Sequence, residues 1–117
     1  MDYSRGNIEN VSLSGLLNLK DLRCNFANLT NLNLSSLPKL EYLDCQNNDL
    51  TNLDLSFNPN LKTLILNDNN IENIDLSGST QLIHLDVNSN NISYLNVSSL
   101  INLKKLYASN NKLTSLN

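Results

Sequence analysis

Leu82–Asn102 reads LIHLDVNSNNISYLNVSSLIN, and the rest of the chain repeats it at intervals of 21 residues. The preceding copies are Leu61–Gln81 (LKTLILNDNNIENIDLSGSTQ), Leu40–Asn60 (LEYLDCQNNDLTNLDLSFNPN) and Leu19–Lys39 (LKDLRCNFANLTNLNLSSLPK), and a further copy begins in Leu103–Asn117. A fixed period of this size is typical of a solenoid. Each unit is too small to bury its own leucines, but stacked units cover one another.

The spacing of apolar residues within the unit predicts strands. If the leucine that opens each unit is position 1, apolar residues fill positions 1, 4, 6, 11, 14 and 16 of every complete unit. Apolar and polar residues alternate in Leu85-Asp86-Val87, which is strand periodicity, and no helical period is sustained. The pattern LxxLxLxxN at positions 1 to 9 is echoed at positions 11 to 19. We therefore predict an all-β solenoid with parallel ladders at positions 3 to 7 and 13 to 17 of each coil, and little or no helix.

Asparagine recurs at position 9, where the unit turns: Asn48, Asn69, Asn90 and Asn111. A buried tight turn leaves backbone N–H and C=O groups that need partners, and an amide side chain offers both donors and an acceptor. We expect a structural asparagine ladder, in which stacked amides can also bond one another. Ala27 occupies this position in the first complete unit, so that turn needs another partner.

The consensus L-x-x-L-x-L/C/V-x-x-N-x-L/I is represented by Leu61, Leu64, Leu66, Asn69 and Ile71. It resembles the leucine-rich repeat family. The second half of the unit, LxxLDLS, looks like the short bacterial class sometimes called IRREKO and is similar to internalin-type repeats. The resemblance implies a right-handed, curved coil used for protein recognition rather than catalysis.

The repeat predicts a single domain over residues 1–117. Residues 1–18 form a degenerate first coil, 19–102 hold four full repeats, and 103–117 are a partial last repeat. The last repeat contains leucines that a following coil covers elsewhere. Such an end exposes apolar side chains and unpaired strand groups, so we expect it to fray or to associate end to end with another copy.

The overall charge excludes one class of partner. The formal net charge is −3 and the isoelectric point is about 4.8, which gives no electrostatic case for nucleic acid. The sequence has no long apolar run for membrane insertion and no recognisable leader pattern. We expect a cytoplasmic protein if the 117 residues are complete, and a secreted or cell-surface one if they belong to a longer chain.

Residues capable of catalysis or metal binding are few. Cys24 and Cys45 share the inward position 6, which favours buried thiols that behave as small apolar side chains; a disulfide between neighbouring coils is the alternative. His84 is the only histidine and faces elsewhere, so it cannot complete a metal site with them. Asp54 and Asp75 should be neighbours on a flat open face without a partner base, and we interpret them as solvated charges. We predict no enzyme activity, no cofactor and no metal.

The outward positions 3 and 5 of the first strand differ from unit to unit while the core positions hardly change. Tyrosine and arginine are residue types enriched in the energetically dominant parts of interfaces. We therefore predict a non-catalytic protein–protein interaction module; the alternative is a structural spacer or a cell-surface adhesin segment of a larger protein. The candidate binding residues for a protein partner are Arg23, Tyr42, Asp44, Ile65, His84, Asp86 and Tyr107.

Overall fold

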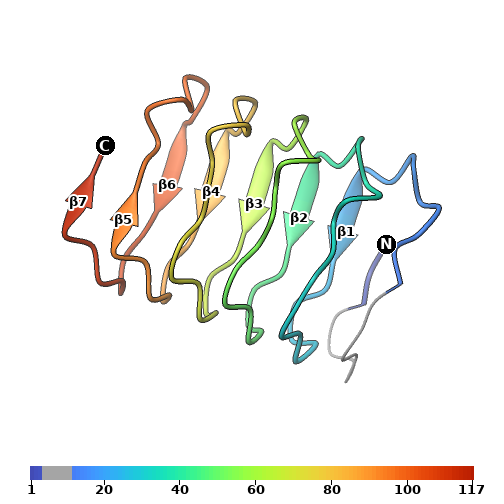
Figure 1. Cartoon of the computed structure of the whole chain (residues 1–117), viewed down its shortest axis with the longest axis horizontal. Helices are drawn as coiled ribbons and strands as arrows, with labels where there is room; N and C mark the ends of the chain where they lie inside the picture. The colour runs from blue at the N-terminus through green and yellow to red at the C-terminus, as the bar shows by residue number, and fades with distance from the viewer. Residues whose placement is uncertain (4–11) are drawn as a thin grey trace.

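A computed structural model describes residues 1–3 and 12–117 as a stack of coils measuring 37 × 26 × 18 Å (Figure 1). The described residues contain strands and no helix. The expected β-solenoid with parallel strands is thus confirmed. The apolar residues Ile8 and Val11, assigned to the degenerate first coil, lie outside the described residues.

One strand from each coil contributes to a five-stranded parallel sheet in the order β1-β2-β3-β4-β6. The register follows the repeat, because Leu22 pairs with Leu43, and Leu43 pairs in turn with Leu64. A separate pair, β5 (Tyr94–Leu95) and β7 (Ser115–Leu116), lies on the opposite side of the last coils. The strands of the main sheet are β1 (Asp21–Arg23), β2 (Tyr42–Asp44), β3 (Thr63–Ile65), β4 (His84–Asp86) and β6 (Lys105–Tyr107).

These strands cover positions 3 to 5 and not the predicted 3 to 7, although bonds between the coils continue beyond them, from Cys24 N to Asp44 O at 2.9 Å and from Phe26 N to Gln46 O at 3.1 Å. The backbone then turns at position 8. The residue there has a positive φ in each of the five coils from Leu19 onward, for example 55° at Asn47 and 56° at Asp68. Asparagine and aspartate tolerate this left-handed conformation better than most residues. Phe26 adopts it as well, with a φ of 56°, although it has a bulky side chain.

The predicted second ladder forms only between β5 and β7, so that expectation is wrong for the earlier coils. There the coils keep one short bond at the start of the segment, from Asp49 N to Leu29 O at 2.9 Å. Between the next two coils the same bond runs from Asn70 N to Leu50 O at 2.9 Å, and the bond after it, from Glu72 N to Thr51 O, is longer at 3.4 Å. The extended segment then ends at a side-chain turn, in which the Asp54 carboxylate accepts the N–H of Ser56 at 2.9 Å.

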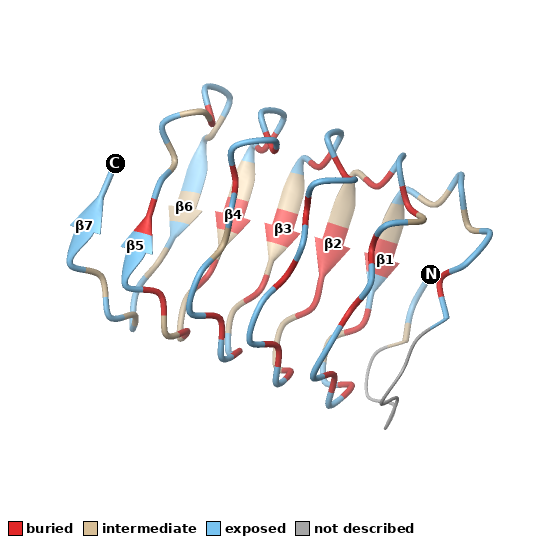
Figure 2. Cartoon of the chain, in the orientation of Figure 1, coloured by how far each residue is buried: buried red, intermediate tan, exposed pale blue. Residues whose placement is uncertain are grey.

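The leucines at position 4 of the first four complete coils are fully buried: Leu22, Leu43, Leu64 and Leu85. Figure 2 shows this buried stripe running through β1 to β4 and fading in the last coil. In that coil Leu106 and Leu113 are half-buried, and Leu116 is 53% exposed. The core therefore depends on each coil being covered by the next.

Each asparagine at position 9 bonds the backbone of its own coil and of the preceding coil. The Asn69 Oδ1 accepts Leu50 N–H at 3.0 Å, and its Nδ2 donates to Cys45 O at 2.9 Å and Leu66 O at 3.0 Å. The amides bond backbone groups and not one another within the described part of the chain, so the expected amide–amide bonds are not formed. The turn at Ala27 is satisfied by the following coil, because Asn48 Oδ1 accepts the Ala27 N–H at 3.1 Å.

Asn69→Ala should therefore lower the free energy of unfolding by about 1–3 kcal/mol, because it leaves the buried Leu50 N–H without its partner. Urea denaturation measures the change. Asn67→Ala is the matched control: Asn67 is half-buried, its amide bonds mainly the exposed Asp68, and its loss should change stability by about 0.5 kcal/mol or less. Equal losses in the two variants would contradict a special role for position 9.

The incomplete cover of the last coil predicts uneven protection. In the 117-residue chain at low concentration, amides of residues 103–116 should exchange faster than those of residues 61–74, which have coils on both sides. Hydrogen exchange measures this, and light scattering across concentration reports any association through the exposed edge. A strictly monomeric chain with equal protection in the two segments would overturn the expectation.

Candidate functional site

The candidate site is the outer surface of the five-stranded sheet, formed by the side chains at positions 3 and 5; we call it the sheet face. Alternation along each strand places Leu43 inside and its neighbours Tyr42 and Asp44 on this outer side. The parallel register aligns all seven predicted residues on the same surface. The sequence-based placement on one sheet therefore agrees with the topology.

Their accessibility is less uniform than the sequence suggests. Arg23 and Tyr107 are exposed, the latter at 46%, whereas Tyr42, His84 and Asp86 are half-buried. Ile65 is half-buried too. Asp44 is only 7% exposed, so it offers a partner little surface.

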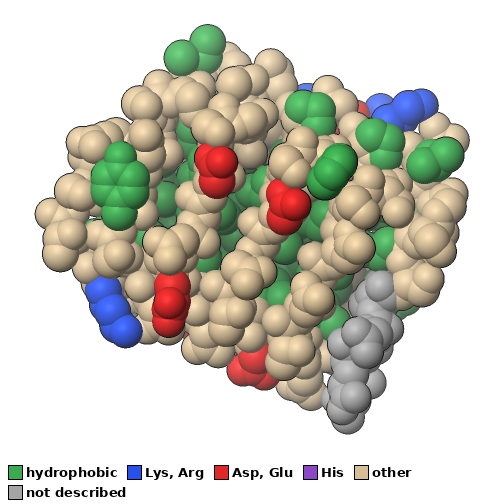
Figure 3. Space-filling model, viewed as in Figure 1, with side chains coloured by type: hydrophobic (Ala, Val, Ile, Leu, Met, Phe, Trp, Pro, Cys, Tyr) green, Lys and Arg blue, Asp and Glu red, His purple; other side chains and the backbone are tan. Residues whose placement is uncertain are grey.

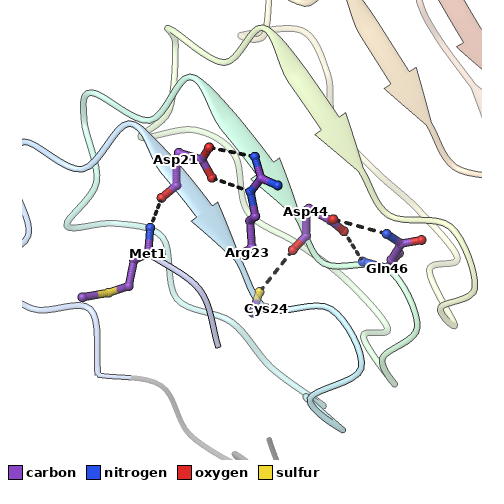
Figure 4. Close-up of polar contacts among 6 residues, drawn as sticks. All are labelled: Met1, Asp21, Arg23, Cys24, Asp44 and Gln46. Atoms are coloured by element: carbon purple, nitrogen blue, oxygen red, sulfur yellow. Dashed lines mark hydrogen bonds and ion pairs between the residues drawn. The ribbon is translucent and has the colours of Figure 1, made fainter. Parts of the chain in front are cut away.

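At the β1 and β2 end, Arg23 organises a charged and aromatic cluster. Its guanidinium forms a two-pronged ion pair with Asp21 at 3.0 and 3.1 Å, and it lies 4.7 Å from the centre of the Tyr42 ring (Figure 4 shows the ion pair). The hydrogen bond from Arg23 lowers the pKa of Asp21, whereas burial, followed by the charge of Asp44, raises the pKa of Tyr42. The ion pair and the ring contact together orient the planar guanidinium.

Asp44 and Asp86 serve the sheet rather than a ligand. The Asp44 carboxylate accepts Gln46 N–H and Gln46 Nε2–H, both at 3.2 Å (Figure 4), and Asp86 accepts Asn88 N–H at 3.0 Å. Each carboxylate satisfies the backbone just after its strand ends. Sequence reasoning missed this role, although an aspartate two residues before a turn is a known signal for such bonds.

At the β4 and β6 end, His84 and Tyr107 form an aromatic pair. Their ring centres lie 5.6 Å apart with an interplanar angle of 64°, an edge-to-face arrangement that stabilises aromatic pairs. Lys105 pairs with His84 in the register and is exposed beside it. Ile65, in β3, separates this cluster from the one at Arg23. The sheet face therefore carries two polar–aromatic clusters with an aliphatic centre.

Other candidate groups lie away from this surface. Cys24 and Cys45 are buried free thiols with their Sγ atoms 3.0 Å apart, and burial raises the pKa of Cys45. Asp54 and Asp75 are exposed, and hydrogen bonds from Ser56 and Ser77, respectively, lower their pKa values. Among residues 1–3 and 12–117, no three His, Cys, Asp or Glu side chains gather as metal ligands, and no helix there could cross a membrane. The geometry of the sheet face suits non-covalent recognition.

A parallel sheet built from 21-residue coils that buried asparagines join places the chain among the β-solenoid repeat proteins. No family model and no curated protein matches the chain. Solved structures do match. InlJ of Listeria monocytogenes, whose functional domain is described as including a cysteine ladder, is 32% identical over 100% of this chain, with a TM-score of 0.96. A leucine-rich-repeat protein of Leptospira interrogans is 27% identical over 90%, with a TM-score of 0.82, and YopM of Yersinia enterocolitica is 26% identical over 86%, with a TM-score of 0.77.

The chain thus has the leucine-rich-repeat solenoid fold and is similar to the internalins. It covers 26% of InlJ, 30% of the Leptospira protein and 21% of YopM, so it corresponds to a fraction of each of these longer chains. Domains with this fold typically mediate protein interactions and are generally non-catalytic.

The ion pair at the β1 end makes a testable electrostatic prediction. Arg23→Gln removes the largest cause of the low pKa of Asp21, so that pKa should rise towards the ordinary aspartate value of 3.8. An NMR titration of the aspartate side chains measures it. Asp54 is the internal control, because its pKa is lowered by Ser56 and not by Arg23, and it should not move. An unchanged Asp21 would show that the pair does not persist in solution.

Proposed function

We propose that the chain is a non-catalytic protein-binding module that uses the sheet face. The observation that supports this most is the Arg23–Tyr42 arrangement, in which a guanidinium lies over an aromatic ring and also pairs with Asp21. Side chains ordered before binding lose less entropy when a partner arrives. Arginine and tyrosine are also among the residues that contribute most to protein interfaces.

The second cluster strengthens the proposal because it lies on the same surface. Tyr107 packs edge-on against His84 and still exposes 46% of its surface, so it can contact a partner without rearranging. Half-buried Ile65 provides an apolar centre between the clusters. Residues at the rim of such a patch contribute by excluding water rather than by direct energy. The two tyrosines are accordingly the residues on which binding should depend.

Tyr42→Ala and Tyr107→Ala should each weaken a protein partner by about 1–2 kcal/mol while the fold stays intact. The whole chain is used as bait in an affinity enrichment with quantitative mass spectrometry, comparing wild type with the double tyrosine variant. Tyr94→Ala is the matched control, because Tyr94 is also 46% exposed but belongs to β5 on the other side of the coil. Proteins captured by wild type and by the control should be lost from the double variant.

Stability is checked separately, since a misfolded bait also loses partners. Leu64→Ala, inside the solenoid, should lower the free energy of unfolding by about 2–5 kcal/mol, whereas the tyrosine variants should unfold close to wild type. If the double tyrosine variant folds and captures every protein that wild type captures, the sheet face is the wrong surface. That outcome would favour the spacer or adhesin-segment interpretation.

A further inference from the structure

Positive charge gathers on one edge of the solenoid, where the chain enters each strand. We call this surface the loop edge and define it by positions 21 and 2 of the coils. Four of the six lysines in the chain lie there: Lys20, Lys39, Lys62 and Lys104. Glu41 is the only acidic residue in these two rows, although the whole chain has a net charge of −3. In Figure 3 blue side chains lie at the upper rim and another lies at the lower left, while most of the red ones lie on the front and towards the lower rim.

The opposite edge, at positions 8 to 12, has the reverse balance. Among the described residues it carries Asp49, Asp68 and Glu72 against a single basic residue, Lys112. The charge is therefore segregated across the width of the coil and does not simply follow composition. Segregation of this kind steers oppositely charged partners towards one side of a protein.

Most of the loop-edge charge remains available to a partner. Glu41 bridges Lys20 at 2.8 Å and Lys62 at 2.6 Å, and the hydrogen bonds from both lysines lower its pKa to about 2. One carboxylate thus offsets two ammonium groups. Lys39 bonds only the neutral amide of Asn18, and Lys104 has no ion pair within the described residues. Exposed ion pairs are weak, so an incoming carboxylate can replace Glu41 as a partner.

A notch lies between these lysines, across the third and fourth complete coils and the partial last coil. It is a cavity of about 370 Å³ lined by Lys62, Gln81, Ile83, Ile101, Asn102 and Lys104, among others. Ile101 is 86% exposed and Ile83 38% exposed, which is unusual for isoleucine in a chain whose other leucines and isoleucines are mostly buried. The notch therefore combines two ammonium groups with two exposed aliphatic side chains.

We propose that the loop edge is a second docking surface, which takes an acidic peptide segment of a partner protein. An aliphatic side chain of the segment fills the notch between Ile83 and Ile101. Aspartate or glutamate carboxylates on either side of it bond Lys62 and Lys104. This surface is separate from the sheet face and does not depend on the function proposed for it.

Charge complementarity favours an acidic peptide over other anions. Neutral amides at Asn60, Gln81 and Asn102 and the carboxylate of Glu41 interrupt the lysines, whereas a nucleic acid or an anionic membrane presents continuous negative charge. The net charge of −3 also opposes approach to such extended surfaces. A short segment with one aliphatic residue between acidic ones matches the alternation of the edge.

The probe is a fluorescein-labelled peptide with one leucine flanked on each side by two glutamates, and binding to the full chain is followed by fluorescence anisotropy at low salt. Lys62→Gln with Lys104→Gln should weaken binding roughly tenfold, and Ile83→Ser with Ile101→Ser should do the same. Lys105→Gln with Lys112→Gln removes the same amount of charge from positions outside the loop edge and should change affinity less than about twofold. A peptide with serine in place of the leucine should also bind more weakly.

A variant that should tighten binding distinguishes a direct effect on the loop edge from a loss of the fold. Glu41→Gln frees Lys20 and Lys62 and should tighten binding several-fold, whereas Asp68→Asn, an equal charge change on the opposite edge, should not. The tyrosine variants of the sheet face should bind the peptide normally, which separates this proposal from the first.

Three results would overturn the proposal: no peptide binding at about millimolar concentration, equal weakening by the Lys105 and Lys112 control, or no tightening by Glu41→Gln. Vesicles of phosphatidylserine are tested in parallel. Binding to vesicles that requires Lys62 and Lys104, without peptide binding, would assign the edge to a lipid surface instead.

Discussion

The bond between a buried asparagine amide and the backbone of the preceding coil is the constraint on which the solenoid depends. Asn90 accepts the Ile71 N–H at 2.9 Å and donates to Leu66 O at 3.0 Å, both in the coil before it. A buried amide with unmet donors destabilises a fold, so each coil must return to the same height with the same number of residues. The constant 21-residue period is the consequence, and the leucine core follows from it.

A fixed period separates the residues that hold the coil from those that face outward. Position 4 is leucine in every complete coil, whereas position 5 changes from Arg23 to Asp44, Ile65 and Asp86 without altering the strand. Outer side chains can therefore vary while their spacing stays fixed by the sheet, at about 4.8 Å from strand to strand. A rigid array of unlike side chains results, and such an array suits recognition because little ordering remains to be done on binding.

The sequence predicts the buried core of the solenoid well, because the apolar residues of the core recur at fixed positions of the repeat. Leu22, Leu43 and Leu64 recur at one phase, and a recurring apolar phase can only face the core. Local backbone features are harder to read. Asn47 and Asp68 suggest the left-handed turn at position 8, but Phe26 adopts the same conformation with no such signal.

The exposure and contacts of individual side chains on the sheet face could not be predicted from the sequence. Asp44 shares its phase with exposed Arg23, yet it is almost buried because Gln46 folds back onto its carboxylate. The cation–π contact of Arg23 with Tyr42 also depends on how neighbouring coils align. Periodicity gives the face on which a residue lies, whereas accessibility depends on contacts between coils that no single repeat contains.

The size of the sheet face links the two proposed surfaces. Five strands about 4.8 Å apart and three residues long span about 19 Å by 10 Å. This area is small compared with the roughly 800 Å² that each partner contributes to a stable protein interface. A partner bound tightly to this chain must therefore contact residues beyond the strands. The loop edge is adjacent, because Lys104 on that edge is followed directly by Lys105 at the start of β6. Contact with both surfaces would combine an aromatic anchor with charge steering, so affinity and association rate would be set by different residues.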